Sequence, residues 1–195
     1  MDDGLRLSPP GSAWLALAAA LGVGAVGAWL LPAALLDWQP AQAAAEPWRA
    51  FSAAFVHWSP LHLGANLVGV AVVAALGWGA RLPWPYALAW LTAWPLTQLG
   101  LLATPALAHY GGLSGVLHAG VAVAGLALLL RERGPRQAVG AAVLAGLASK
   151  VLLEEPWGPP LRPGGGWDIA VAPVAHASGA LAGLVGAGLA WALLR

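Results

Sequence analysis

A serine between two glycines begins one of the apolar segments of this chain, in the run Gly112-Leu113-Ser114-Gly115. A serine hydroxyl becomes a nucleophile when a neighbouring base takes its proton, and histidine is the usual base. His176 begins the last apolar segment and is the candidate base. The same serine also fits a helix N-cap or a small helix-packing residue. The chemistry therefore depends on whether Ser114 and His176 meet.

A second polar pair, His62 and Asn66, lies four positions apart in another apolar segment. Residues at i and i+4 share one helix face, so both side chains project together. Each can donate a hydrogen bond to the oxyanion that develops during acyl transfer. The alternative is a polar pair that joins two helices, and the sequence leaves both interpretations open.

The acidic residues limit the possible chemistry, because none occurs between Pro47 and Arg131. Aspartyl intramembrane proteolysis would require two carboxylates within spans, and zinc-dependent cleavage would require a His-Glu-x-x-His helix. Neither pattern is present, and the chain has no cysteine for thiol catalysis or disulfides. Metal ligation by histidines alone is the minor alternative. We therefore expect a Ser114–His176 dyad without a carboxylate partner, cofactor or metal.

The composition is that of an integral membrane protein. Hydrophobic residues make up 59% of the chain and charged residues 9%, and the mean hydropathy is +0.73. The many glycines and prolines are compatible with membrane helices, which pack closely through glycine and tolerate proline. A net charge of +1 gives no indication of nucleic-acid binding.

A membrane span requires about 20 apolar residues. The sequence predicts an all-α membrane protein, residues 1–195 forming one domain, with six spans at residues 12–36, 57–79, 84–104, 113–130, 137–153 and 171–194. The first segment resembles a signal peptide followed by Ala41-Gln42-Ala43. Its apolar run is too long for one and its start is acidic rather than basic, so we expect a retained helix.

The basic residues predict an orientation. With a cytoplasmic N-terminus, the inner segments contain six of the nine basic residues and the outer segments three (Arg49, Lys150 and Arg162). The positive-inside rule then places both termini, and with them Arg6, on the cytoplasmic side. Ser114, His176 and His62 fall near the outer ends of three different spans. Gly179 and Gly183 form a Gly-x-x-x-Gly face that could pack His176 against the start of the fourth span.

Together these motifs resemble the rhomboid family of intramembrane serine proteases. The Gly-x-Ser-Gly at 112–115, the His-x-x-x-Asn at 62–66 and the Ala-His-x-x-Gly at 175–179 occur in the family's order, and Trp48-Arg49 resembles its first-loop motif. The resemblance covers residues 46–194, with the helix at 12–36 as the first span. It implies that Ser114 is the nucleophile and His176 the general base. It also implies an oxyanion hole formed by His62, Asn66 and the Ser114 backbone N–H.

One departure from the family narrows the resemblance. Many rhomboids have a tyrosine four residues after the serine, whereas this chain has His118. The run from Tyr110 to His118 resembles the rhombosortases, a bacterial subfamily, which implies an inner-membrane enzyme with a periplasmic active site. Its substrates would be membrane-anchored proteins with a C-terminal Gly-Gly-type sorting tail. His118 is expected to pack near the base, and an alternative is that it acts as the base itself.

The segment 155–170, rich in proline and glycine, is by resemblance the cap over the active site, with Trp157 and Trp167 in the gating loop. The alternative is a simple connector. Two other functions compete with the protease: a catalytically inactive relative that binds membrane clients, and a small transporter. Inactive relatives typically lose the serine or the histidine, and a transporter would need charged residues in mid-span. The sequence therefore favours the protease.

Overall fold

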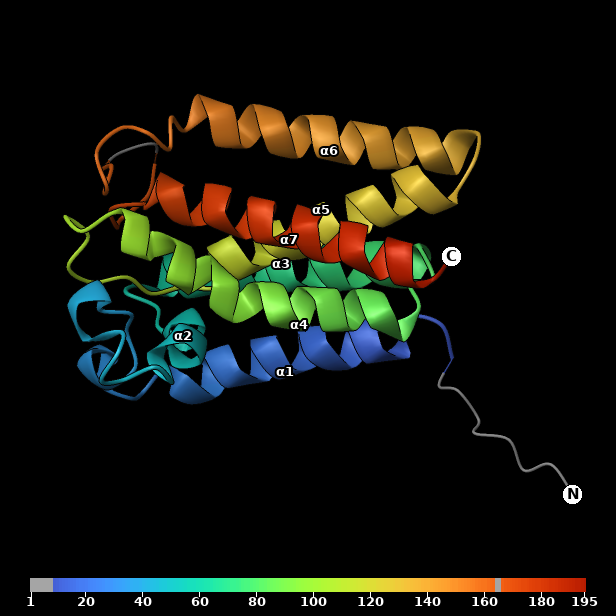
Figure 1. Ribbon diagram of the computed structural model, residues 1–195. Coiled ribbons are helices and arrows are strands. Elements are labelled where there is room, and N and C mark those ends of the chain that lie inside the picture. Colours follow the sequence, from blue (N-terminus) through green and yellow to red (C-terminus); the bar gives the residue numbers. More distant parts are fainter. Residues whose placement is uncertain (1–8, 164–165) are drawn as a thin grey trace, which may run out of the picture.

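The computed structural model describes residues 9–163 and 166–195. In these residues the chain forms helices, with two isolated antiparallel bridges and no longer strand. The long helices run side by side between the two ends of the molecule (Figure 1). They are α1 (Ser12–Ala28), α3 (Pro60–Gly79), α4 (Trp84–Leu99), α5 (Ser114–Arg131), α6 (Pro135–Leu153) and α7 (Pro173–Leu193). A short helix, α2 (Arg49–Ser52), lies in the long connection between α1 and α3.

Four of the described helices, α3, α5, α6 and α7, are long and apolar enough to cross a membrane. This agrees with the prediction of a helical membrane protein. The helix α1 has 17 residues and α4 has 16, fewer than the roughly 20 that a span requires. The six predicted crossings therefore stay a prediction.

Two of the predicted spans were too long. The first, predicted to reach residue 36, ends as a helix at Ala28, because Pro32 disfavours helical backbone in the residue before it. The third, predicted to reach residue 104, ends at Leu99 and continues as the 3₁₀ turn Gly100–Ala103. Pro95 lies four residues before the end of this helix, where it removes one backbone hydrogen bond.

The start of α3 shows how local sequence positions a polar side chain. Pro60 occupies the first turn, where a missing N–H is tolerated. The Ser59 hydroxyl accepts a hydrogen bond of 3.0 Å from the backbone N–H of His62 and caps the helix. His62 is thereby fixed in the first turn of α3, at the end of the bundle where α5 and α7 also begin.

The helix α5 lies at the centre of the bundle, packed against α3, α4, α6 and α7. Its closest neighbour is α7, whose glycines meet the α5 backbone. A Cβ at Gly179 would lie 2.0 Å from the Gly115 carbonyl oxygen, and a Cβ at Gly183 would lie 2.4 Å from that of Ala119. The predicted Gly-x-x-x-Gly packing between these helices is confirmed.

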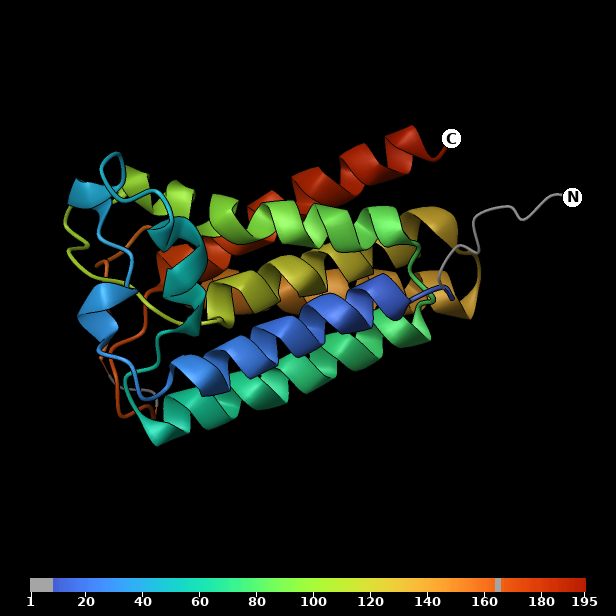
Figure 2. The same cartoon turned by 90° about the horizontal axis from the view of Figure 1, so that it is seen from below.

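The helices α1 and α6 lie on opposite sides of the bundle (Figures 1 and 2). The helix α1 packs mainly against α3, whereas α6 packs mainly against α5. Only Gly140 and Leu147 of α6 are buried, so most of this helix faces outward. An apolar helix with so much exposed surface is the arrangement expected where lipid replaces water.

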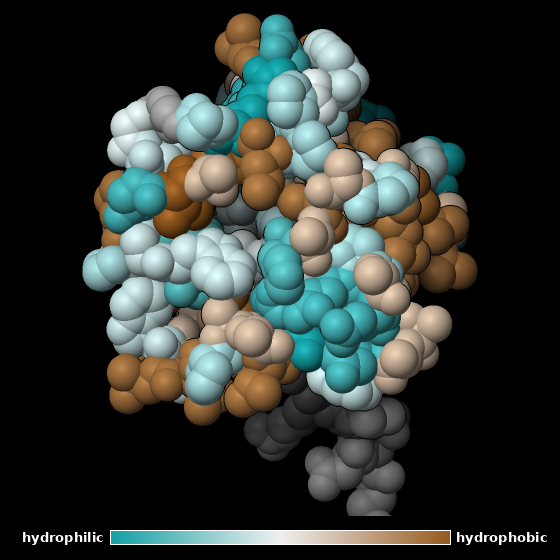
Figure 3. All heavy atoms as spheres, turned by 90° about the vertical axis from the view of Figure 1, so that its left-hand side faces the viewer, coloured by the Kyte–Doolittle hydropathy of each residue, from teal (hydrophilic) through white to brown (hydrophobic). Residues whose placement is uncertain are grey.

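The two ends of the bundle differ in chemistry. Arg81, Arg131, Arg133 and Arg136 lie at the end where α1 begins and α7 ends, whereas Arg49, Lys150 and Arg162 lie near the opposite end. Arg6, counted with the first group in the sequence argument, lies outside the described residues. Figure 3 faces the end near Arg49, Lys150 and Arg162. Hydrophilic residues gather in the middle of this face, while apolar surface lies mainly along its sides.

Candidate active site

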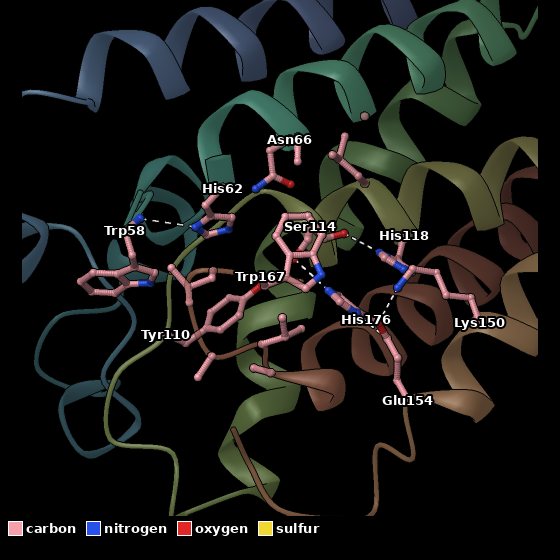
Figure 4. A pocket seen from close by; sticks show the side chains of 18 of the residues that line it. Trp58, His62, Asn66, Tyr110, Ser114, His118, Lys150, Glu154, Trp167 and His176 are labelled. Carbon is pink, nitrogen blue, oxygen red and sulfur yellow. Dashed lines mark hydrogen bonds and ion pairs between the residues drawn. The ribbon is translucent and has the colours of Figure 1, made fainter. Parts of the chain in front are cut away.

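Ser114 and His176 meet at the end of the bundle where α5 and α7 begin. His176 Nε2 lies 2.9 Å from Ser114 Oγ, within hydrogen-bond distance, and His176 is almost fully buried (Figure 4). Ser114 is the first residue of α5, and His176 lies in the first turn of α7. The glycine packing between the two helices brings these turns together. A histidine in this position can take the proton of the serine hydroxyl.

A carboxylate accompanies the pair, and the expectation of a dyad without one was wrong in this respect. His176 Nδ1 lies 2.6 Å from Oε2 of Glu154, so the two ring nitrogens contact a serine on one side and a carboxylate on the other. Glu154 follows the last residue of α6 and lies outside the apolar part of any span. A carboxylate at such a position is not expected from the apolar segments alone.

The charge state of Glu154 follows from its two cationic or proton-donating neighbours. Burial opposes its ionisation, but hydrogen bonds and charge interactions with His176 and Lys150 outweigh burial and lower the pKa of Glu154 to about 2. Lys150 Nζ contacts the other carboxylate oxygen, Oε1. Glu154 is therefore an anion at neutral pH.

His62 and Asn66 face the serine from α3 (Figure 4). The backbone N–H of Trp58 lies 3.4 Å from His62 Nδ1, which leaves Nε2 free to face the cavity. A Cβ at Gly112 would lie 2.7 Å from His62 Nε2 and 3.9 Å from Asn66 Nδ2. Gly112 also has φ 129°, which favours glycine, so its lack of a side chain keeps both donors close to the serine loop.

His118 stacks on His176. The two rings are nearly parallel, with an interplanar angle of 8° and centroids 4.2 Å apart. His118 Nδ1 lies 2.6 Å from the backbone carbonyl oxygen of Ser114, to which it donates. This contact engages the backbone of Ser114 and not its hydroxyl. The geometry therefore matches the packing interpretation of His118 better than the alternative in which His118 itself is the base.

Tyr110 is a site residue that the sequence argument did not single out. Its ring is buried below the serine, and its hydroxyl would lie 3.2 Å from a Cβ at Gly115. Burial raises the pKa of Tyr110 to about 12, so the hydroxyl keeps its proton and can donate. An antiparallel bridge to Trp38 holds this residue in place.

A cavity of about 430 Å³ opens beside Ser114. It extends from the polar groups of the site along α3, α5 and α6, where the lining residues are small or apolar: Gly69, Val72, Val73, Leu117, Val121, Gly146 and Leu147. Trp167 lines this cavity and lies over the serine in Figure 4. Trp157 is 70% exposed and does not line it, so the structure brings only one of the two loop tryptophans to the site.

The segment 155–170 is attached to the bundle at described points. The Ser59 hydroxyl donates to Asp168 Oδ1 at 2.7 Å, and Arg162 pairs with Val171 as an antiparallel bridge. Gly164 and Gly165 of this segment lie outside the described residues.

Arg49 of the Trp48-Arg49 motif organises the connection before α3. It is buried and donates to Asp37 and to the carbonyl of Ala34. Asp37 is itself buried and also contacts His109 Nδ1 at 2.6 Å. Because His109 lines the cavity, the motif supports one wall of the site without contacting the serine.

Comparisons with protein-family models and with curated proteins give no match for this chain. The function of this chain is therefore inferred from the geometry of the site. That geometry combines a serine hydroxyl on an imidazole, an anionic carboxylate on the far ring nitrogen, and two side-chain donors beside the serine. Such an arrangement is suited to acyl transfer through a serine ester.

Proposed function

We propose that the protein is an intramembrane serine endopeptidase of the rhomboid type. The observation that carries the proposal is the 2.9 Å contact between Ser114 Oγ and His176 Nε2 at the start of two apolar helices. Isolated serines and histidines in membrane helices have ordinary packing roles, but a base on a hydroxyl beside a cavity has a direct chemical use.

The proposed reaction has two stages. Ser114 Oγ attacks the scissile carbonyl carbon while its proton passes to His176 Nε2, and the carbonyl oxygen becomes an oxyanion. His62 Nε2, Asn66 Nδ2 and the Ser114 N–H, at the start of α5, are the donors proposed to stabilise it. Collapse breaks the C–N bond, and His176 returns the proton to the leaving amine. Water then attacks the ester, gives its proton to His176, and the freed Ser114 Oγ recovers it.

The cavity supports a membrane-anchored protein as substrate. Beyond the polar groups of the site, its lining along α3 and α6 is made of small or apolar residues, which suits an extended chain that enters from the side of the bundle. We further propose a bacterial inner-membrane location with the site on the periplasmic side, and sorting tails of the Gly-Gly type as substrates. These finer proposals depend on the motif resemblance and on the distribution of basic residues.

A catalytically inactive, client-binding relative is the second candidate. It has no specific support in the geometry, because such a protein needs neither the hydroxyl–imidazole contact nor an anion on the far nitrogen. A fluorophosphonate probe separates the two functions, since it forms a covalent bond only with an activated serine.

The experiment labels the purified full-length protein in detergent. We expect labelling of the wild type and none of the Ser114→Ala and His176→Ala variants, while Ser149→Ala, which removes an exposed serine of α6, labels normally. Asn66→Ala should retain labelling but cleave a co-expressed Gly-Gly-tailed protein about 100-fold more slowly, because other donors remain. A wild type that is not labelled, or equal labelling of Ser114→Ala, would overturn the proposal.

A further inference from the structure

The contact between His176 and Glu154 has the geometry of a catalytic triad. The ring nitrogen away from the serine lies 2.6 Å from Oε2 of Glu154, while the other lies 2.9 Å from Ser114 Oγ. The His176 side chain is 6% exposed and that of Glu154 26%, so water has limited access to this hydrogen bond. A neutral imidazole that donates from Nδ1 must present its lone pair at Nε2, which faces the hydroxyl.

We propose that Glu154 is a positioning residue for His176, completing a Ser114–His176–Glu154 triad, and that Lys150 holds its carboxylate in place. This inference depends on the proposed serine peptidase function. It changes the mechanism from a dyad to a triad, because the carboxylate fixes the tautomer of the base and stabilises the imidazolium that forms in each stage.

The place of Glu154 in the helix supports a role beyond the helix itself. It caps the C-terminal end of α6, where the helix dipole disfavours an anion. Lys150, one turn earlier, contacts Oε1 and offsets this cost, while leaving Oε2 for His176. Glu154 is thus unfavourable for the helix itself, yet its two carboxylate oxygens contact residues of α6 and α7. Such a residue is expected where function overrides local preference.

A metal site is the competing use of this cluster. One ligand atom each from His118, Glu154 and His176 can be chosen so that all lie within 4.8 Å of one another. However, the two imidazoles are stacked within 8° of parallel, so their in-plane lone pairs point in parallel planes and do not converge on one ion. Both nitrogens of His176 and one of His118 also have partners. The triad requires no such rearrangement.

The experiment compares charge-neutralising variants at the two ends of the bundle. Glu132 forms an i,i+4 pair with Arg136, as Glu154 does with Lys150, and both glutamate side chains are 26% exposed. We expect Glu154→Gln to react with the fluorophosphonate about 100-fold more slowly than the wild type, with little change in the KM for a peptide substrate. Glu132→Gln, the matched control, should react at the wild-type rate. Lys150→Gln should be slower by only about 3- to 10-fold, since Glu154 keeps its charge.

The pH dependence of labelling distinguishes the proposed role of Glu154 from a purely structural one, because loss of a structural contact alone would not shift it. The titratable groups around the imidazole are Glu154 and Lys150 at the end of α6, His118 on α5 and His62 on α3. Removing the one anion among them destabilises the imidazolium, so the acidic half of the pH–rate curve should move to lower pH in Glu154→Gln. Glu154→Asp, which keeps the charge, should recover part of the rate and the wild-type curve. It also provides the test if Glu154→Gln does not fold.

The outcomes separate this inference from the function on which it depends. Wild-type labelling combined with an unchanged rate and pH curve in Glu154→Gln would overturn the triad but leave the serine peptidase. Absence of wild-type labelling would overturn both. Slow labelling of Glu154→Gln that Glu154→Asp does not improve, or activation of the wild type by added Zn²⁺, would also contradict the triad.

Discussion

The helix α5 meets its two neighbours α7 and α6 in different ways along its length. Against α7, the backbones are in close contact at the site end, where Gly179 and Gly183 meet the carbonyls of Gly115 and Ala119. Against α6, close contact occurs at the other end: a Cβ at Gly140 would lie 2.6 Å from the Leu129 nitrogen. Toward the site α6 is more open, and the cavity lies against Gly146, where a Cβ would meet nothing within 4 Å.

This difference bears on the proposed serine peptidase, which would need both a fixed serine–histidine pair and space for a substrate. The distance between Ser114 and His176 is set by backbone contacts between α5 and α7, which cannot relax without moving a helix. The carboxylate is supplied by the end of α6, through an ion pair and one hydrogen bond at a partly exposed position. Rigid packing thus holds Ser114 and His176 together, while the more open side of α5 borders the cavity.

The largest effect is expected from adding a methyl group at Gly179, where α7 touches the backbone of α5. Gly179→Ala places a methyl group 2.0 Å from a backbone oxygen, so α7 must shift away from α5. We expect a destabilisation of about 2–3 kcal/mol and at least a 100-fold loss of activity, because the serine and the base separate. Thermal unfolding and fluorophosphonate labelling measure the two effects. Gly188→Ala on the same helix, where a Cβ meets nothing within 4 Å, is the control.

Gly140→Ala should affect stability without an equal effect on chemistry. Its added methyl group would meet backbone atoms of α5 at 2.6–2.8 Å, at the end of the bundle far from the serine. We expect a destabilisation of about 1–3 kcal/mol and a change in labelling rate of less than about 5-fold. Labelling below 20 °C, where the variant stays folded, tests this. A rate loss as large as that of Gly179→Ala would show that the two contacts are not separable.

Acidification should act on the α6 side of the site. The pKa of Glu154 is lowered from 4.5 to about 2, so its ionised form contributes stability that is fully present above pH 4.5 and is lost as the pH falls toward 2. The wild type should lose about 2–4 °C more in unfolding temperature than Glu154→Gln between pH 5 and pH 2.5. A constant difference between the two proteins across this range would contradict the sign.

The smallest effect is expected from Gly146→Ala. Gly146 is a glycine toward the site end of α6, as Gly179 is of α7. However, Gly146 lines the cavity, and no atom lies within 4 Å of the added methyl group. Alanine also favours the helix by about 1 kcal/mol relative to glycine. The unfolding temperature should stay the same or rise by a few degrees. A clear decrease would mean that α6 packs on α5 as tightly as α7 does.

Several features of the fold were accessible from the sequence. Apolar length predicted helices at all six long segments, because a span leaves a continuous hydrophobic run. The spacing of Gly179 and Gly183 predicted the close approach of α7 to α5. The same reasoning made the first and third spans too long, because hydropathy counts Leu30 and Leu31 but does not register how Pro32 ends a helix.

The candidate site was only partly accessible. Ser114, His176, His62 and Asn66 could be proposed because each has a side chain with a recognisable chemical use near the outer end of a span. His118 was proposed only because it replaces a tyrosine in the motif that the chain resembles. Glu154 was not proposed because it lies outside the apolar part of the spans, although its i,i+4 spacing from Lys150 at the outer end of a span was a usable signal. Tyr110 and His109 belong to a loop, where no periodicity indicates which side chains turn inward.

The sequence by itself determined the class of the protein and the stock of reactive groups, since composition and hydropathy depend only on residue types. It also determined the close packing of α7, since only glycine permits backbones to touch at that spacing. The tertiary structure decided which groups form contacts. Glu154 and His176 are 22 positions apart and belong to different helices, so only the way α6 and α7 pack around α5 places the carboxylate on the imidazole. Hydrogen bonds such as this one require atoms placed at short distance and in the right direction. The packing of the helices sets that placement, and no local sequence pattern encodes it.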